Sequence, residues 1–123
     1  MAEVPRTTTV LCVDDDSSFL RLMQMSLELD GYTVITENDA QAALQLAATS
    51  TDIDAVVTDF HMPGFSGEQL CAEIRRVKPL LPILMFSGSP QTIPTQVIRT
   101  VDLLLDKAEG IPEVSAALRR LAA

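Results

Sequence analysis

The sequence predicts the α/β class: one doubly wound domain in which a five-stranded parallel sheet carries helices on both faces. Five short apolar runs, rich in β-branched residues, alternate with five stretches of helical periodicity. Neighbouring parallel strands need crossover connections, and the helical stretches supply them. The 123 residues, 47% of them apolar, are enough for one core and leave little for a second unit.

The predicted strands are bounded by polar or turn-forming residues. A flexible lead-in is expected over residues 1–7, which show no periodicity. The third run, Ala55 to Thr58, is typical of a strand buried on both faces of a parallel sheet. In chain order we expect strands at residues 8–13, 32–36, 55–58, 82–86 and 101–105.

Helices are predicted between and after the strands by caps and apolar stripes. Ser66 and Gln69 have the spacing of a capping box, and Gly31 and Pro79 are placed to end the first and third helices. The other candidate starts are Asp16 or Ser17, Asn38 or Asp39, Pro94, and Pro112. The residues expected to face the sheet are Leu20, Met23 and Leu27; Ala43, Leu44 and Ala47; Leu70, Ile74 and Val77; and Leu118 and Leu121.

Charge and hydropathy exclude several classes of function. The formal net charge is −8 with nine basic residues, which argues against binding a nucleic-acid backbone. The apolar runs are too short to cross a bilayer and no leader is recognised, so a cytoplasmic protein without membrane contact is expected. Cys12 and Cys71 have neither metal-ligand nor redox spacing, and we expect two buried, reduced thiols.

Polar side chains follow four of the predicted strands. In a sheet of the flavodoxin-like order 2-1-3-4-5, ligands bind beyond the carboxyl ends of the strands, where the winding reverses between strands one and three. These two strands end in Asp14 and Asp15 and in Asp59, while the fourth and fifth end in Ser87 and Lys107. We therefore expect all five side chains to surround one site.

This set of side chains suits phosphoryl transfer. Clustered carboxylates repel one another unless a cation or a proton intervenes, and an all-oxygen ligand set favours Mg²⁺. The hydroxyl group of Ser87 and the ammonium group of Lys107 are donors suited to a phosphoryl group. Asp59 is then the natural nucleophile, because the chemistry needs mainly positioning and charge neutralisation.

Four motifs resemble the receiver domain of two-component response regulators. They are Val-Asp-Asp at 13–15, Asp-Phe-His-Met-Pro-Gly-Phe-Ser-Gly at 59–67, Ser-Gly at 87–88, and Lys107. Each motif is weak alone, but four in this order at these separations are highly specific. The resemblance runs from Val10 to the last helix, so a receiver domain is expected over residues 8–123.

The resemblance implies a role for each residue. Asp59 would receive a phosphoryl group from the phosphohistidine of a sensor histidine kinase or phosphotransfer protein. Mg²⁺ would be held by Asp15, Asp59 and the backbone carbonyl of His61, with Asp14 reaching it through water. Ser87 and Lys107 would hold the phosphoryl oxygens. The signal would reach a downstream protein target through the face made by helix four, strand five and helix five, without turnover of a substrate.

Three positions depart from the family's pattern or vary within it. Leu104 stands where receivers commonly carry an aromatic residue that reorients on activation, so a smaller aliphatic repacking is expected. Ala108 follows Lys107 where the family usually has a cis proline, and a trans bond is expected because a cis bond without proline costs about 2.5–4 kcal/mol. His61 lies where the family varies the lifetime of the acyl phosphate; the simpler interpretation is a solvated side chain contributing only its carbonyl group.

Two other functions compete with a phosphorylation-controlled switch. The chain could be a phosphorylation-independent interaction module that kept the fold, a monomer or weak dimer like the switch itself. It could also be a Mg²⁺-dependent phosphatase of the haloacid-dehalogenase type, for which Asp14 and Asp16 have the required Asp-x-Asp spacing. That hypothesis leaves Asp59 without a role and lacks residues for the usual cap.

Overall fold

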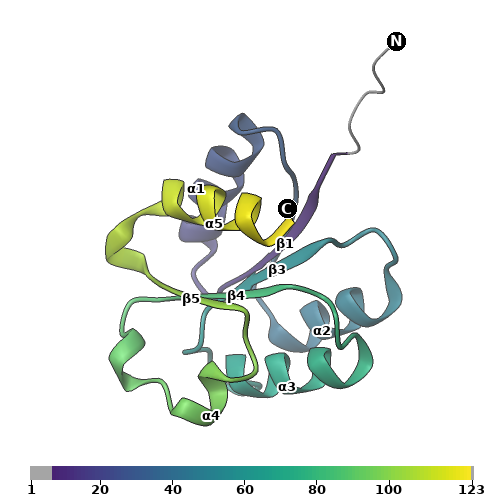
Figure 1. The fold of residues 1–123 in the computed structure, drawn as a ribbon, viewed down its shortest axis with the longest axis vertical. Coiled ribbons are helices and arrows are strands. Elements are labelled where there is room, and N and C mark those ends of the chain that lie inside the picture. The colour runs from purple at the N-terminus through teal and green to yellow at the C-terminus, as the bar shows by residue number, and fades with distance from the viewer. Residues whose placement is uncertain (1–6, 123) are drawn as a thin grey trace.

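Five parallel strands form one sheet in the order β2-β1-β3-β4-β5, as predicted (Figure 1). The computed structural model describes residues 7–122, so most of the predicted lead-in lies outside the described residues. Strand β1 pairs with both β2 and β3, and the winding reverses between β1 and β3. The strands are β1 (Thr9–Val13), β2 (Thr33–Glu37), β3 (Ala55–Thr58), β4 (Ile83–Ser87) and β5 (Leu103–Asp106).

Helices follow each strand, and both faces of the sheet are covered. Figure 1 shows α1 and α5 on one side of the sheet and α2, α3 and α4 on the other. Two short 3₁₀ turns, Pro90–Thr92 and Lys107–Glu109, follow β4 and β5. The helices are α1 (Ser17–Leu29), α2 (Ala40–Thr49), α3 (Gly67–Val77), α4 (Thr95–Ile98) and α5 (Ile111–Ala122). No helix within residues 7–122 combines the length and the hydropathy needed to cross a bilayer.

The core consists of two apolar layers separated by the sheet, because successive strand side chains point to opposite faces. In β1, Val10 and Cys12 pack with α1 and α5, whereas Leu11 and Val13 pack with α2 and α3. Strands β1, β3 and β4 are buried on both faces, which explains their uninterrupted apolar runs. The sheet therefore presents its polar groups only where strands end.

Caps place the helix starts where the sequence predicts. The Asp16 carboxylate accepts hydrogen bonds from the backbone N–H groups of Ser18 and Phe19. Asp39 caps α2, and the Ser66–Gln69 capping box is confirmed. Gly67 begins α3 directly against the end of β3, where an added Cβ atom would overlap the Asp59 carbonyl oxygen. Glycine is thus required for α3 to start beside Asp59.

Two details of the prediction are wrong. Val77 is 38% exposed, and Cys71 lies on the buried face of α3 with Leu70 and Ile74. Val77 belongs to the last turn and falls at the edge of that stripe. Strand β5 begins at Leu103 rather than at residue 101, and Asp102 just before it accepts a hydrogen bond from the Ile83 N–H group through its carboxylate.

Arg75 fixes the end of the sheet opposite the polar strand ends. Its guanidinium donates to the carbonyl oxygens of Thr100, Pro79 and Leu81 and forms an ion pair of 3.0 Å with Asp102. These bonds tie α3 to the segments that enter β4 and β5. The planar guanidinium with its five donors is suited to holding several acceptors at once.

Cys12 and Cys71 are buried, free thiols in opposite layers, as expected. Burial raises the pKa of each thiol to about 12, although the charge of Arg75 opposes this for Cys71. Both groups are therefore neutral packing residues at neutral pH.

Candidate functional site

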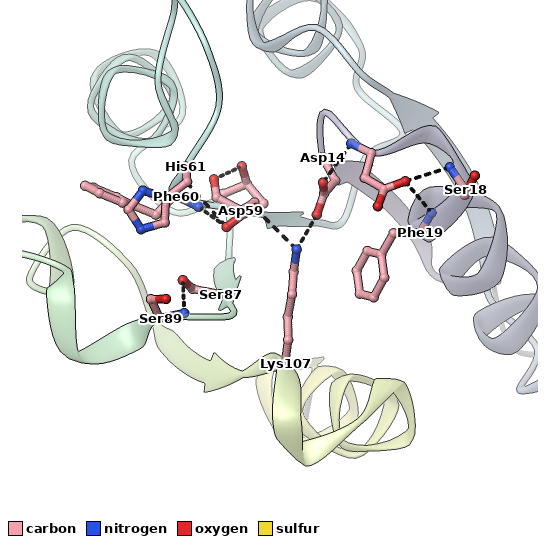
Figure 2. Close-up of polar contacts among 11 residues, drawn as sticks. Asp14, Ser18, Phe19, Asp59, Phe60, His61, Ser87, Ser89 and Lys107 are labelled. Atoms are coloured by element: carbon pink, nitrogen blue, oxygen red, sulfur yellow. Dashed lines mark hydrogen bonds and ion pairs between the residues drawn. The ribbon is translucent and has the colours of Figure 1, made fainter.

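The ends of β1, β3 and β5 bring three carboxylates and one ammonium group together (Figure 2). Asp14 and Asp15 follow β1, Asp59 follows β3, and Lys107 follows β5. Asp14 and Asp59 are buried and Asp15 is exposed. This is the edge of the sheet at which the sequence predicted a site.

The carboxylates of Asp14, Asp15 and Asp59 form the one group of possible metal ligands found among residues 7–122. One oxygen from each lies within 4.8 Å of the others. Mg²⁺ binds oxygen at about 2.1 Å, so opposite ligands stand about 4.2 Å apart. The three oxygen atoms are therefore close enough together to face one ion, and hard carboxylate oxygens are the ligands that Mg²⁺ prefers.

Asp14 and Asp59 are held in the same way, each by one oxygen on the backbone and one on Lys107. Asp14 accepts a hydrogen bond of 2.9 Å from the Asp16 N–H group through Oδ1, and Asp59 accepts one of 2.7 Å from the Phe60 N–H group. The His61 N–H group also points to Asp59 Oδ1, at 3.4 Å. Backbone donors thus orient both side chains and leave each Oδ2 atom facing the ammonium group.

Lys107 joins the two buried carboxylates. Its Nζ atom lies 2.8 Å from Asp14 Oδ2 and 3.3 Å from Asp59 Oδ2. Partial burial works to lower the pKa of this ammonium, but the hydrogen bonds and negative charges of Asp14 and Asp59 outweigh that effect and raise the pKa. Lys107 is therefore a fixed positive charge at this site across the physiological range.

Ser87 ends β4 and is fully buried. Its Oγ atom accepts a hydrogen bond of 3.1 Å from the Ser89 N–H group, so its hydroxyl is engaged by the β4–α4 loop. Figure 2 shows Ser87 on the Asp59 side of Lys107. The Ser87 side chain is thus joined directly to the backbone of that loop.

The His61 side chain bridges two loops. Its Nε2 atom lies 3.3 Å from Thr92 Oγ1, and the Thr92 hydroxyl donates to the Ser89 carbonyl oxygen at 2.7 Å. The single hydroxyl proton of Thr92 is used in the second bond, and an Nε2-protonated tautomer of His61 is the one that would donate to Thr92. The imidazole is exposed, but it contacts the β4–α4 loop as well as water.

The structure shows the surroundings of Ala108 and Leu104, the two residues that depart from the common receiver pattern. The Ala108 N–H group donates to Asp106 Oδ1 at 2.8 Å, a bond that proline could not make, and no cis peptide bond occurs within residues 7–122. The expected trans bond is confirmed. Leu104 is half-buried and packs in the layer of α2 and α3, away from Lys107.

The structure gives Asp16 and Phe19, two residues near the site, roles that differ from those inferred from the sequence. Asp16, needed by the phosphatase hypothesis, is exposed and caps α1 instead of joining the carboxylate group. The sequence indicates no role for Phe19 in the site, but its ring lies against the Lys107 ammonium, with the centroid 4.4 Å from Nζ. Spacing gives no signal for this contact, because it depends on the direction in which the Phe19 ring points.

Known proteins are similar to this chain in sequence and in fold. A family model described as the response regulator receiver domain matches residues 10–119. The alkaline phosphatase synthesis transcriptional regulatory protein PhoP of Bacillus subtilis (strain 168) is 38% identical over 82 residues, which are 67% of this chain and 34% of that protein. The chain thus spans about a third of that relative's length.

Solved structures superpose closely. A response regulator receiver domain protein from Clostridium thermocellum has a TM-score of 0.83 and 25% identity, covering 93% of each chain. A response regulator protein from Burkholderia pseudomallei, with a phosphorylated aspartic acid, calcium ion and citrate, has a TM-score of 0.77 and 26% identity. That match covers 90% of this chain and 66% of the other.

Proposed function

The chain belongs to the response regulator receiver domain family, and we propose that it is a phosphorylation-controlled switch in which Asp59 accepts the phosphoryl group. The observation that carries this assignment is the position of the Asp59 carboxylate, which is buried at the end of β3 with Oδ1 held by the Phe60 N–H group and Oδ2 facing Lys107. The relative from Burkholderia pseudomallei, which contains a phosphorylated aspartic acid, supports the assignment.

The transfer uses Asp59 Oδ2 as the nucleophile. Oδ1 is occupied by backbone donors, whereas the partner of Oδ2 is an ammonium group able to move to a phosphoryl oxygen. The new oxygen–phosphorus bond forms as the phosphorus–nitrogen bond of a donor phosphohistidine breaks, and the imidazole leaves with the electron pair. Lys107 offsets the negative charge that this transfer brings to the site.

Asp15, Asp59 and the backbone carbonyl of His61 would hold Mg²⁺, with Asp14 reaching it through water. The ion, when bound, neutralises charge on the acidic cluster and on the incoming phosphoryl oxygens. The chain's own part is to orient the ligands, through the Asp16 N–H group on Asp14 and the Phe60 N–H group on Asp59. The calcium ion of the relative supports a divalent cation at such a site.

Ser87 would report the phosphoryl group to the rest of the domain. Drawing its hydroxyl to a phosphoryl oxygen breaks the hydrogen bond from the Ser89 N–H group and releases the β4–α4 loop. The His61–Thr92 bridge holds that same loop, so His61 acts as a modulator of loop release and of acyl-phosphate lifetime. Leu104 repacks within its aliphatic layer in place of an aromatic rotation.

The partners are proteins. A sensor histidine kinase or a phosphotransfer protein would donate the phosphoryl group, and a downstream protein would read the face of α4, β5 and α5. The net charge of −8 supports protein contacts over direct nucleic-acid or membrane contacts. We place the chain in the cytoplasm as a monomer or weak dimer whose only covalent chemistry is its own phosphorylation and dephosphorylation.

Intact-mass spectrometry after incubation with Mg²⁺ and acetyl phosphate tests this function. We expect one added phosphoryl mass in the wild type, and none in Asp59→Asn or in the presence of EDTA. Asp16→Asn is the matched control, because this carboxylate lies at the same edge of the sheet, after β1, but caps α1. Mg²⁺-independent modification, or full modification of Asp59→Asn, contradicts the proposal. Absence of both the adduct and Mg²⁺ binding would favour the phosphorylation-independent interaction module.

A further inference from the structure

The Lys107 ammonium has a third neighbour that the proposed chemistry does not use. The ring of Phe19, the third residue of α1, faces Nζ with 4.4 Å between Nζ and the ring centroid. Figure 2 shows the ring beside the lysine side chain as that chain rises between Asp14 and Asp59. Two carboxylates and one aromatic face therefore enclose the ammonium group.

Phe19 is fixed much more firmly than Lys107. Its backbone N–H group donates to Asp16 Oδ1 at 3.1 Å, and its ring packs 5.9 Å from that of Phe86, with the two planes at 35°. Phe86 is fully buried in β4, immediately before Ser87. The Phe19 ring thus packs against a buried core residue, whereas the Lys107 ammonium is carried on a flexible four-carbon side chain.

The same short turn places both Phe19 and Asp14. The Asp16 carboxylate caps the Phe19 N–H group, and the Asp16 N–H group donates to Asp14 Oδ1. The distance between the aromatic ring and the Asp14 carboxylate is therefore set by one local structure. The Lys107 ammonium contacts both groups, with Asp14 Oδ2 2.8 Å from Nζ and the ring centroid 4.4 Å from it.

An aromatic face attracts a cation without carrying a full negative charge. It therefore holds the ammonium near the site without competing for it as a third carboxylate would. An aliphatic side chain of similar size would fill the space and give no such attraction.

We propose that Phe19 is a positioning residue for Lys107, whose ring keeps the ammonium at the acceptor carboxylate and available to the phosphoryl oxygens. This inference rests on the proposed function of Lys107. Phe19 touches neither the phosphoryl group nor the metal, and it acts only through the lysine. It gives the chain a link between α1 and Lys107 that is independent of residue 104.

Lysine labelled with ¹³C at the ε position gives a direct test, because Lys78 and Lys107 are the two lysines of the sequence. Protons above an aromatic face are shielded, so the ε protons of Lys107 should resonate upfield of those of Lys78. Lys78 donates to the Ser50 carbonyl oxygen and serves as the internal reference. We expect Phe19→Leu to abolish the upfield shift and Phe19→Tyr to retain it.

Phosphorylation kinetics supply the second measurement. With acetyl phosphate and Mg²⁺, we expect Phe19→Leu to lower the phosphorylation rate constant about two- to five-fold, and Phe19→Tyr to restore it. Far-UV circular dichroism checks that both variants are folded. An unchanged Lys107 resonance in Phe19→Leu, or a Phe19→Tyr variant as slow as Phe19→Leu, would overturn the positioning role.

The two measurements separate this inference from the proposed function. The Lys107 resonance is recorded without phosphodonor and reports the ring contact alone. If the Lys107 resonance depends on Phe19 but the wild-type protein accepts no phosphoryl group, the phosphorylation switch is refuted and the ring contact is established. Normal phosphorylation with no ring shift would refute the role of Phe19 alone.

Discussion

Replacing Lys107 with methionine should destabilise the metal-free protein. Methionine keeps an unbranched apolar chain and removes the positive charge, which leaves the buried carboxylates of Asp14 and Asp59 facing each other unneutralised. With Nζ at 2.8 and 3.3 Å from the two carboxylates, each attraction is about 5–6 kcal/mol before desolvation, at an effective dielectric constant of about 20.

Desolvation offsets most of that attraction. Removing one partner of a fully buried ion pair typically costs about 3–5 kcal/mol. The Lys107 side chain is 25% exposed, so water screens the site, and we expect a loss of about 2–3 kcal/mol. For a domain of this size that loss lowers the melting temperature by about 10 °C.

Urea unfolding followed by far-UV circular dichroism measures this loss, since the chain has no tryptophan. In EDTA, Asp14→Asn in the Lys107→Met background should recover about 1–2 kcal/mol, because it removes one uncompensated charge. Mg²⁺ should stabilise Lys107→Met more than the wild type, because the ammonium no longer competes for the carboxylates. Equal urea midpoints for Lys107→Met and wild type in EDTA would refute this account of the site, as would an Asp14→Asn substitution that recovers nothing.

Further predictions concern the thiols, the start of α3 and the metal. Burial raises the pKa of Cys12 and Cys71 from 9.0 to about 12, so the stability due to their neutral forms is complete below pH 9 and is lost as the pH rises toward 12. Between pH 8 and 10.5, the free energy of unfolding measured with urea should fall by an amount approaching about 1.4 kcal/mol per pH unit for each thiol. In the double variant Cys12→Ala and Cys71→Ala, this free energy should fall less steeply with pH. Gly67→Ala should cost about 1–3 kcal/mol and slow phosphorylation of Asp59, because its Cβ atom would overlap that residue's carbonyl oxygen. Gly88→Ala, with open space around its Cβ position, is the control, and equal unfolding midpoints for the two variants would contradict the argument. Mg²⁺ at about 100 times its dissociation constant should stabilise the wild type by about 2.7 kcal/mol in a thermal melt and Asp59→Asn much less; equal shifts would exclude Asp59 as a ligand.

The sequence predicts the fold and the meeting of the acidic residues for the same physical reason. Parallel strands place their carboxyl ends at one edge of the sheet, so a polar residue after each apolar run lands in one place. Asp14, Asp59 and Lys107 are found together because topology alone brings them there. No knowledge of side-chain conformation is needed for that step.

Contacts that depend on side-chain direction could not be predicted. Phe19 meets Lys107 because the Asp16 cap and the Phe86 ring set its orientation, and neither effect appears in residue spacing. The Thr92–His61 bridge depends on the conformation of a 3₁₀ turn that no periodicity indicates. These side-chain contacts can be identified only once the conformations of the loops are known.

The bonds made by Arg75 determine what kind of motion the protein can use. Thr100 and Asp102 are anchored to α3 and β4 at the far end of the sheet. At the near end, the segment that follows Ser87 is held by the hydrogen bond from the Ser89 N–H group to Ser87 and by the His61–Thr92 bridge, while Ile93 and Val97 pack in the core. A segment fixed at one end and released at the other turns about its anchor and does not slide. In the switch that we propose, a rearrangement that starts at Ser87 would turn α4 about Thr100 and would leave the pairing of β5 with β4 in register. Such a motion would change the surface formed by α4 and would keep the strand order of the sheet.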